Sequence, residues 1–206
     1  MLIRKLIKTI RRESLLRLPL LLLSAVASVG LAAGELSYTN IAVGHTSLEA
    51  LDEDYSGVTI SGSLQFDENA YLFASTNDAT SDDTIAGKER DNKTTRVGAG
   101  LILPLTERLD INLSVAFHNQ DGDDAIGVID GDGFAVAYGM RGRVGKRFEI
   151  GGSVAHVSAE EKSNSEATLY GRYFLRSAVS LGGSVYGDVF SGDNRGGYAF
   201  DARVDF

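Results

Sequence analysis

The chain has 206 residues, with 20 Lys and Arg against 28 Asp and Glu, which gives a formal net charge of −8. An acidic chain disfavours nucleic acid as a partner, because binding to phosphates requires surfaces rich in Lys and Arg. The chain contains no Cys, which excludes a disulfide framework and a Cys-ligated metal site.

Residues 1–33 have the sequence pattern of a secretory signal peptide. A basic start is followed by an apolar run at 18–29 and then by small residues. A retained membrane helix is the alternative, but the run is short of the ~20 residues that spanning requires. We expect cleavage after Ala27 or Ala33, so that residues 1–33 are the signal peptide and residues 34–206 the exported domain. Its removal takes away six basic residues and one acidic residue, which leaves 14 basic and 27 acidic and a net charge of −13.

The exported domain consists of segments in which apolar and polar residues alternate. This period of two is that of a β-strand with one apolar and one polar face. Eight segments show it clearly, at 58–66, 96–103, 109–118, 134–141, 148–156, 166–175, 179–189 and 196–206, and two are weaker, at 36–46 and 71–77. Their lengths are close to the ~9–11 residues of a tilted transmembrane strand.

The connections between these segments alternate in length. Short turns are predicted at 67–69, 105–108, 145–147 and 176–178, and long polar connections at 47–56, 78–93, 121–132, 159–165 and 191–195. Short periplasmic turns and long extracellular loops are typical of outer-membrane barrels. We therefore predict an all-β fold, a closed antiparallel up-and-down transmembrane β-barrel of ten strands, with eight as the fallback count. A soluble β-sandwich is the alternative.

The polar faces of the segments carry charges of both signs. They are Arg96, Arg141, Arg143, Arg172, Arg203, Asp110, Glu149, Glu166, Asp188, Asp201 and Asp205. A barrel of about eight to ten strands is narrow enough to be filled by side chains. We expect these charges to pair and to plug the lumen, rather than to line a pore. Arg143 and Asp205 lie near strand ends, where we expect them to be solvated.

The long connections are acidic. Carboxylates cluster in the first and third of them, at Glu49, Asp52, Glu53, Asp54 and at Asp121, Asp123, Asp124, Asp130, Asp132. Clustered carboxylates suit Ca²⁺, which takes six to eight oxygen ligands, but their spacing does not match an EF-hand loop. We favour solvated acidic loops, bridged to lipopolysaccharide phosphates by divalent cations, and predict no metal, cofactor or catalytic residue.

Two His-x-Ser patterns occur, at His45-Thr46-Ser47 and His156-Val157-Ser158. Residues i and i+2 of a strand share a face, so His156 and Ser158 are both expected to face lipid. This faintly resembles the outer-membrane lipid A deacylases, but Ala159 stands where that family has Asn. An esterase that uses His156 and Ser158 is therefore kept only as an alternative, and we predict that the chain is not an enzyme.

The exported domain resembles the small outer-membrane barrels of the OmpA/OmpX porin-family type. More narrowly, it resembles the diffusible-signal-factor-regulated outer-membrane barrels, through residues 35–38, 58–64, 69–74 and the last segment, which ends on Phe206. The resemblance implies a compact protein of the cell outer membrane, connected with motility, biofilm and signalling, and no site residue carries over. We expect a structural or surface-interaction role through the acidic loops. Its partners would be outer-membrane lipids and the barrel-assembly machinery, which would read the last strand. A narrow channel is the first alternative.

Overall fold

The computed structural model of this protein describes residues 36–50, 53–81, 91–122, 131–159, 162–189 and 195–206. Within these ranges the backbone forms ten β-strands. They are β1 (Asn40–Ala50), β2 (Glu53–Asp67), β3 (Ala70–Ser81), β4 (Asp91–Thr106), β5 (Leu109–Gly122), β6 (Gly131–Val144), β7 (Phe148–Ala159), β8 (Lys162–Arg176), β9 (Val179–Asp188) and β10 (Gly196–Asp205). In the same ranges we find no helix of the length and apolar character that crossing a membrane requires.

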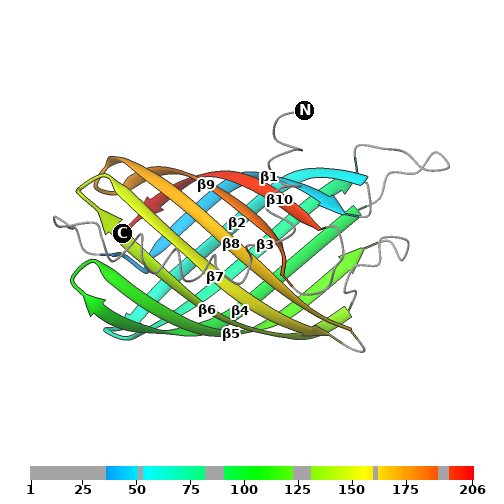
Figure 1. The fold of residues 1–206 in the computed structure, drawn as a ribbon, viewed down its shortest axis with the longest axis horizontal. Helices are drawn as coiled ribbons and strands as arrows, with labels where there is room; N and C mark the ends of the chain where they lie inside the picture. Colours follow the sequence, from blue (N-terminus) through cyan, green and yellow to red (C-terminus); the bar gives the residue numbers. More distant parts are fainter. Residues whose placement is uncertain (1–35, 51–52, 82–90, 123–130, 160–161, 190–194) are drawn as a thin grey trace. The chain divides into compact units, whose positions relative to one another are not determined.

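The strands close into a barrel in which each strand pairs with its neighbours in sequence, and β1 pairs with β10 (Figure 1). Every pairing is antiparallel, and closure brings Asn40 opposite Asp205. The predicted up-and-down barrel is confirmed. Ten is the correct count and eight is wrong, because both weak segments form full strands, β1 and β3. A closed barrel leaves no second sheet to cover the apolar faces, so the sandwich alternative is also wrong.

The barrel has two distinct ends. The short turns lie at the same end as residues 36–39 and the last residue, where the Phe206 amide donates to the Thr39 carbonyl at 3.0 Å. We call this the terminal end, and the opposite end, which carries the other connections, the loop end. Register shifts occur between Pro104 and Thr106 and between Phe174 and Arg176, beside the short turns. Bulges of this kind are common at barrel rims.

The strands extend further toward the loop end than their hydrophobic pattern suggests. The predicted long connection at 47–56 is wrong, because Ser47 pairs with Ser56 and Leu48 with Tyr55. The connection predicted at 159–165 is also mostly strand, with Ala159 paired to Lys162. Backbone hydrogen bonds can continue the ladder after the apolar pattern has ended, so hydropathy underestimates strand length there. The centres of the other long connections lie outside the described residues.

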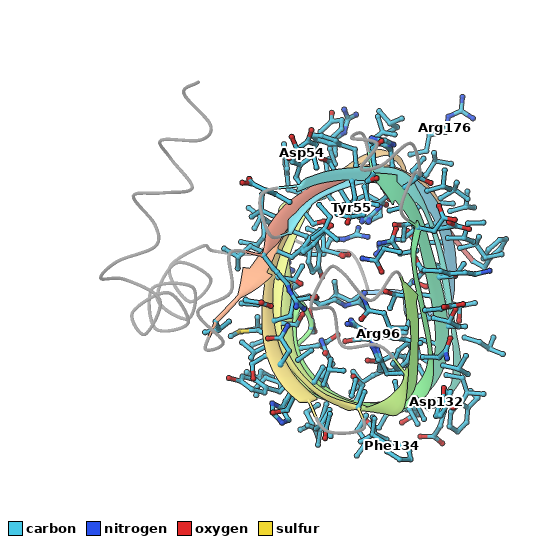
Figure 2. All side chains as sticks on the ribbon, turned by 90° about the vertical axis from the view of Figure 1, so that its right-hand side faces the viewer. Asp54, Tyr55, Arg96, Asp132, Phe134 and Arg176 are labelled. Atoms are coloured by element: carbon cyan, nitrogen blue, oxygen red, sulfur yellow. The ribbon has the colours of Figure 1, made fainter. Side chains whose placement is uncertain are left out.

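The outward side chains form an apolar belt around the barrel. Val115 is 57% exposed, Phe134 70% and Phe200 62%, and Figure 2 shows Phe134 pointing away from the barrel wall. A continuous exposed apolar surface of this kind is unfavourable in water and marks a membrane-facing surface. The terminal strand β10 contributes Tyr198, Phe200, Val204 and Phe206 to this belt, as its alternation predicted.

The inward side chains are mostly polar, with small apolar clusters between them. Tyr38, Tyr71 and Ile102 pack together near the terminal end, and Ala116, Ala135, Val157 and Ala159 form a second cluster. The polarity of the two faces is therefore the reverse of a soluble protein, as expected for a barrel in a bilayer.

Candidate functional site

Charged side chains, most of them buried, gather in the terminal half of the lumen. Four arginines and four carboxylates gather there, and we call them the charged cluster: Arg141, Arg143, Arg172, Arg203, Asp110, Glu149, Asp201 and Asp205. Cross-strand pairing places opposite charges beside each other, because Asp110 lies opposite Arg141 and Glu149 lies opposite both Arg143 and Arg172. Buried charges are tolerated only when they are paired in this way.

Glu149 is the centre of the cluster and is fully buried. Arg203 reaches it from β10 and donates from Nη1 to Oε1 and from Nη2 to Oε2, each at 3.3 Å. The same guanidinium lies beside Asp205, with Nε 3.0 Å from Oδ1. The Tyr170 hydroxyl adds a longer bond to Glu149 Oε1, at 3.4 Å. A two-point contact of this kind fixes the geometry of both side chains.

A second ion pair crosses over β9. Arg172 on β8 donates from Nη2 to Asp201 Oδ1 on β10 at 2.6 Å. Gly182 lies between them on β9, opposite both residues. A Cβ at this position would lie 2.9 Å from the Arg172 guanidinium and 2.9 Å from Asp201 Oδ2. The absence of a side chain at Gly182 therefore leaves the space in which Arg172 and Asp201 meet.

Aromatic rings cover the remaining faces of the guanidinium groups. Arg141 Cζ lies 3.6 Å from the centroid of the Tyr38 ring, and Arg143 Cζ lies 3.7 Å from that of Phe174. Arginine stacked on an aromatic ring is stabilised by the ring quadrupole. The expectation that Arg143 and Asp205 are solvated is wrong, since both are buried. The Phe174 ring covers Arg143, and Arg203 contacts Asp205.

The loop half of the lumen is different, because it contains a cavity of about 290 Å³. Its wall comes from the loop-end halves of the strands and is rich in neutral side chains. Members of the wall include Thr59, Asn77, Thr94, Gln120, Asn164 and Ser184. We call this cavity the vestibule.

An ion pair spans the vestibule. Arg96 on β4 and Glu166 on β8 lie on different sides of the barrel, with Nη1 3.9 Å from Oε1, and Figure 2 shows Arg96 reaching into the lumen. Arg96 Nε also donates to Nδ1 of His118 at 3.2 Å, and His118 is buried. The sequence placed Arg96 and Glu166 on the inward faces. It gave no sign that they meet, because the contact joins strands that are distant around the barrel.

Outward carboxylates, all exposed except the half-buried Glu49, surround the loop end. We call them the acidic rim: Glu49, Asp54, Asp78, Asp91, Asp121 and Asp132. Lys93 lies among them, opposite Asp78 on one side and Asp121 on the other. Within the described residues no three carboxylate or imidazole side chains are close enough to hold a metal ion. Of the acidic residues singled out in the sequence, Asp52, Asp123, Asp124 and Asp130 lie outside the described residues.

His156 and Ser158 both face outward near the loop end, as expected. The hydrogen bond of His156 goes to another serine, since Nδ1 lies 3.0 Å from Oγ of Ser165 on the neighbouring strand. Ser165 is directly opposite His156 in the β7–β8 ladder. Cross-strand pairing, which the sequence pattern did not specify, therefore brings a different serine to the histidine.

Comparison with known proteins shows the fold. The sequence matches no protein-family model and none of the curated proteins. Among solved structures, the chain is similar to the KdgM porin in complex with disordered oligogalacturonate, with a TM-score of 0.51, 10% identity, and coverage of 81% of this chain and 99% of that one. An outer-membrane channel from Pseudomonas putida F1 aligns with a TM-score of 0.49 and 9% identity, over 85% of this chain and 97% of that one.

The attachment invasion locus protein Ail of Yersinia pestis aligns with a TM-score of 0.39 and 13% identity, over 84% of this chain and the whole of that one. The chain has the fold of a small outer-membrane β-barrel, as the broad resemblance implied, and this fold supports the expected location in the outer membrane. The narrower resemblance to the diffusible-signal-factor-regulated barrels and the signal peptide at 1–33 stay predictions.

Proposed function

We propose that this outer-membrane β-barrel acts at the cell surface through the acidic rim at its loop end, and that its charged cluster closes the lumen to solutes. The observation that carries the proposal is the division of its charges. Inside the terminal half, arginines and carboxylates lie beside each other and most of them are buried, whereas the carboxylates of the acidic rim are outward and, apart from the half-buried Glu49, exposed. This division supports a surface role through an acidic collar over a role as an open pore.

The partner that the acidic rim would meet is lipopolysaccharide. Carboxylates and lipid phosphates repel each other unless divalent cations lie between them, and Ca²⁺ and Mg²⁺ prefer oxygen ligands from both. The rim carboxylates are spread around the barrel, so each cation would be shared between one or two of them and the lipid phosphates.

Thermal unfolding in detergent tests this partner. Lipopolysaccharide with Ca²⁺ should raise the Tm of the refolded barrel, and EDTA should reverse the rise. The triple variant Asp78→Asn, Asp121→Asn, Asp132→Asn should lose most of the effect. The matched control is Glu68→Gln with Glu107→Gln, in the turns of the terminal end, which should keep it. An equal rise in the rim variant would contradict the role of the rim.

A narrow channel is the second candidate, and the vestibule is the observation that favours it. Planar-bilayer recordings separate the two functions. We expect no stepwise conductance from the wild-type barrel if the charged cluster closes the lumen as proposed. The double variant Arg172→Ser with Asp201→Ser keeps the charge balance and removes two large side chains, so it should begin to conduct. Regular conductance steps in the wild type would establish the channel instead.

We also propose that the chain has no catalytic activity. The hydrogen bond between His156 and Ser165 speaks against Ser158 as the nucleophile, because a serine nucleophile needs its base within hydrogen-bond reach. An esterase on these strands would have to use Ser165 with His156 instead. The lipid A profile of an overexpressing strain should therefore equal that of strains that carry Ser158→Ala or Ser165→Ala. Deacylated lipid A that disappears with either substitution would show an enzyme.

A further inference from the structure

We propose that the vestibule is a binding site for a small uncharged polyol, a saccharide of one or two rings, that enters from the loop end. This goes beyond the proposed surface role, because it concerns the inside of the barrel and requires no contact with the acidic rim. The cavity volume of about 290 Å³ is at the lower end of the range of small-molecule pockets. With the lumen closed by the charged cluster, a point that rests on the proposed function, a solute would be held rather than passed.

The chemistry of the wall favours hydroxyl groups as ligands. Its neutral polar side chains are mostly hydroxyls and amides, which both donate and accept hydrogen bonds, as sugar hydroxyls do. Asn77 accepts from the Thr59 hydroxyl at 3.3 Å through its carbonyl oxygen, and its amide N–H groups have no side-chain partner among the described residues. The side-chain carbonyl oxygen of Asn92 likewise accepts a hydrogen bond from Gln120 at 3.0 Å. The amide N–H groups of Asn92 also have no side-chain partner among the described residues.

The charged side chains of the vestibule wall balance each other, so we expect no strong preference for an ionic ligand. Two basic side chains, Arg96 and Arg195, share the wall with two acidic ones, Glu166 and Asp188. Asp188 accepts a bond of 2.5 Å from Asn164. An anion would gain from the two arginines and lose to the two carboxylates of the same wall, so a neutral molecule has the advantage. This balance distinguishes the vestibule from a site built for phosphate or carboxylate.

Several wall residues are held in place before any ligand arrives. His118 orients the Arg96 guanidinium through Nε, and Glu166 meets it at Nη1. Tyr186 is bound by Thr46 at 2.8 Å and lies against Gly197, where a Cβ would be 2.6 Å from the Tyr186 hydroxyl. An aromatic ring fixed on the wall offers a flat apolar surface to the C–H face of a sugar. Preorganised side chains of this kind reduce the entropy that binding costs.

Isothermal titration of the refolded barrel tests the proposal. The detergent should be an amine oxide without a sugar headgroup, because a maltoside would compete. The probes are maltose and glucose as neutral sugars, glucuronate as an anion, glucosamine as a cation and glycine betaine as a zwitterion. We expect saturable binding of a neutral sugar with a Kd in the millimolar range, and at least tenfold weaker binding of the charged probes.

Two variants locate the site. Arg96→Met should weaken binding of the neutral sugar about tenfold, whereas Arg176→Met, at the exposed last residue of β8 at the terminal end, should leave it unchanged. Should Arg96→Met fail to refold, as judged by heat-dependent gel mobility, Ser75→Phe would fill the vestibule without a change of charge and should abolish binding. Absence of saturable binding for both neutral sugars would overturn the proposal. Tighter binding of a charged or zwitterionic probe, or binding that survives Ser75→Phe, would overturn it as well.

Discussion

At the scale of single residues, Glu149 compensates the positive charges that are buried in the terminal half of the lumen. It is fully buried and contacts Arg203 through both carboxylate oxygens, while Arg143 and Arg172 lie opposite it on the adjacent strands. Removal of one partner from a buried ion pair leaves the other charge uncompensated, which costs more than the pair itself contributes.

Glu149→Gln should therefore lower the free energy of unfolding by roughly 3–5 kcal/mol, because it leaves the positive charge of the neighbouring arginines uncompensated. Urea unfolding of the refolded barrel in detergent measures the change. Glu107→Gln, in an exposed turn, is the matched control and should be neutral. The double variant Glu149→Gln with Arg203→Met should recover part of the loss, and a single variant as stable as the wild type would show that the pairing is not required.

At the scale of an element, each strand has one face toward the lipid and the other toward the lumen. Strand β5 directs Leu113, Val115 and Phe117 to the exterior, and Asp110 and His118 to the interior. The outward side also changes along its length, since the exposed Asp121 lies beyond the apolar residues, at the loop end. The same face of one strand thus passes from the hydrocarbon belt to the acidic rim.

The loss of stability caused by an arginine substitution on this face should depend on how deep the substituted position lies in the bilayer. Val115→Arg is expected to cost about 2–4 kcal/mol, because the charge would enter the hydrocarbon near the middle of the belt. Asp121→Arg, on the same face of the same strand, should cost only about 0–1 kcal/mol at the interface. Reversible unfolding in phospholipid bilayers measures both. Equal costs at the two positions would mean that the belt is not covered by lipid.

At the scale of the whole molecule, closure of the barrel joins the beginning and end of the described chain. Strand β10 pairs with β1 along its length, and the Phe206 amide continues the ladder to Thr39. Phe206 itself is 75% exposed and makes no contribution to the interior. A side chain that does little for the folded barrel is available for recognition during assembly, which is the role we assign to it with the barrel-assembly machinery.

Phe206→Ala should lower the amount of barrel in the outer membrane several-fold without changing its stability once it is refolded in detergent. Quantitative blotting of outer-membrane fractions measures the first property and heat-dependent gel mobility the second. Phe200→Ala, which changes an exposed aromatic on the same face of β10, is the control and should reach normal levels. Normal membrane levels of Phe206→Ala would count against the docking role.

The sequence by itself determined which face of each clearly alternating strand meets lipid, and therefore the class of fold. A side-chain period of two is a local property, so it can be read from neighbours such as Phe134, Ala135 and Val136 without knowledge of the rest of the chain. The same parity correctly placed Arg141, Glu149 and Arg203 inside the barrel. It could not assign faces to the weak segments that became β1 and β3, because their alternation is broken by small and polar residues.

Only the tertiary structure decided which inward residues meet. Register pairs His156 with Ser165 rather than with Ser158, and closure carries Arg96 across the lumen to Glu166. It also places the paired charges in one half of the lumen and the vestibule in the other. These outcomes depend on strand stagger and barrel circumference, which are properties of all ten strands together and are not encoded in any single one.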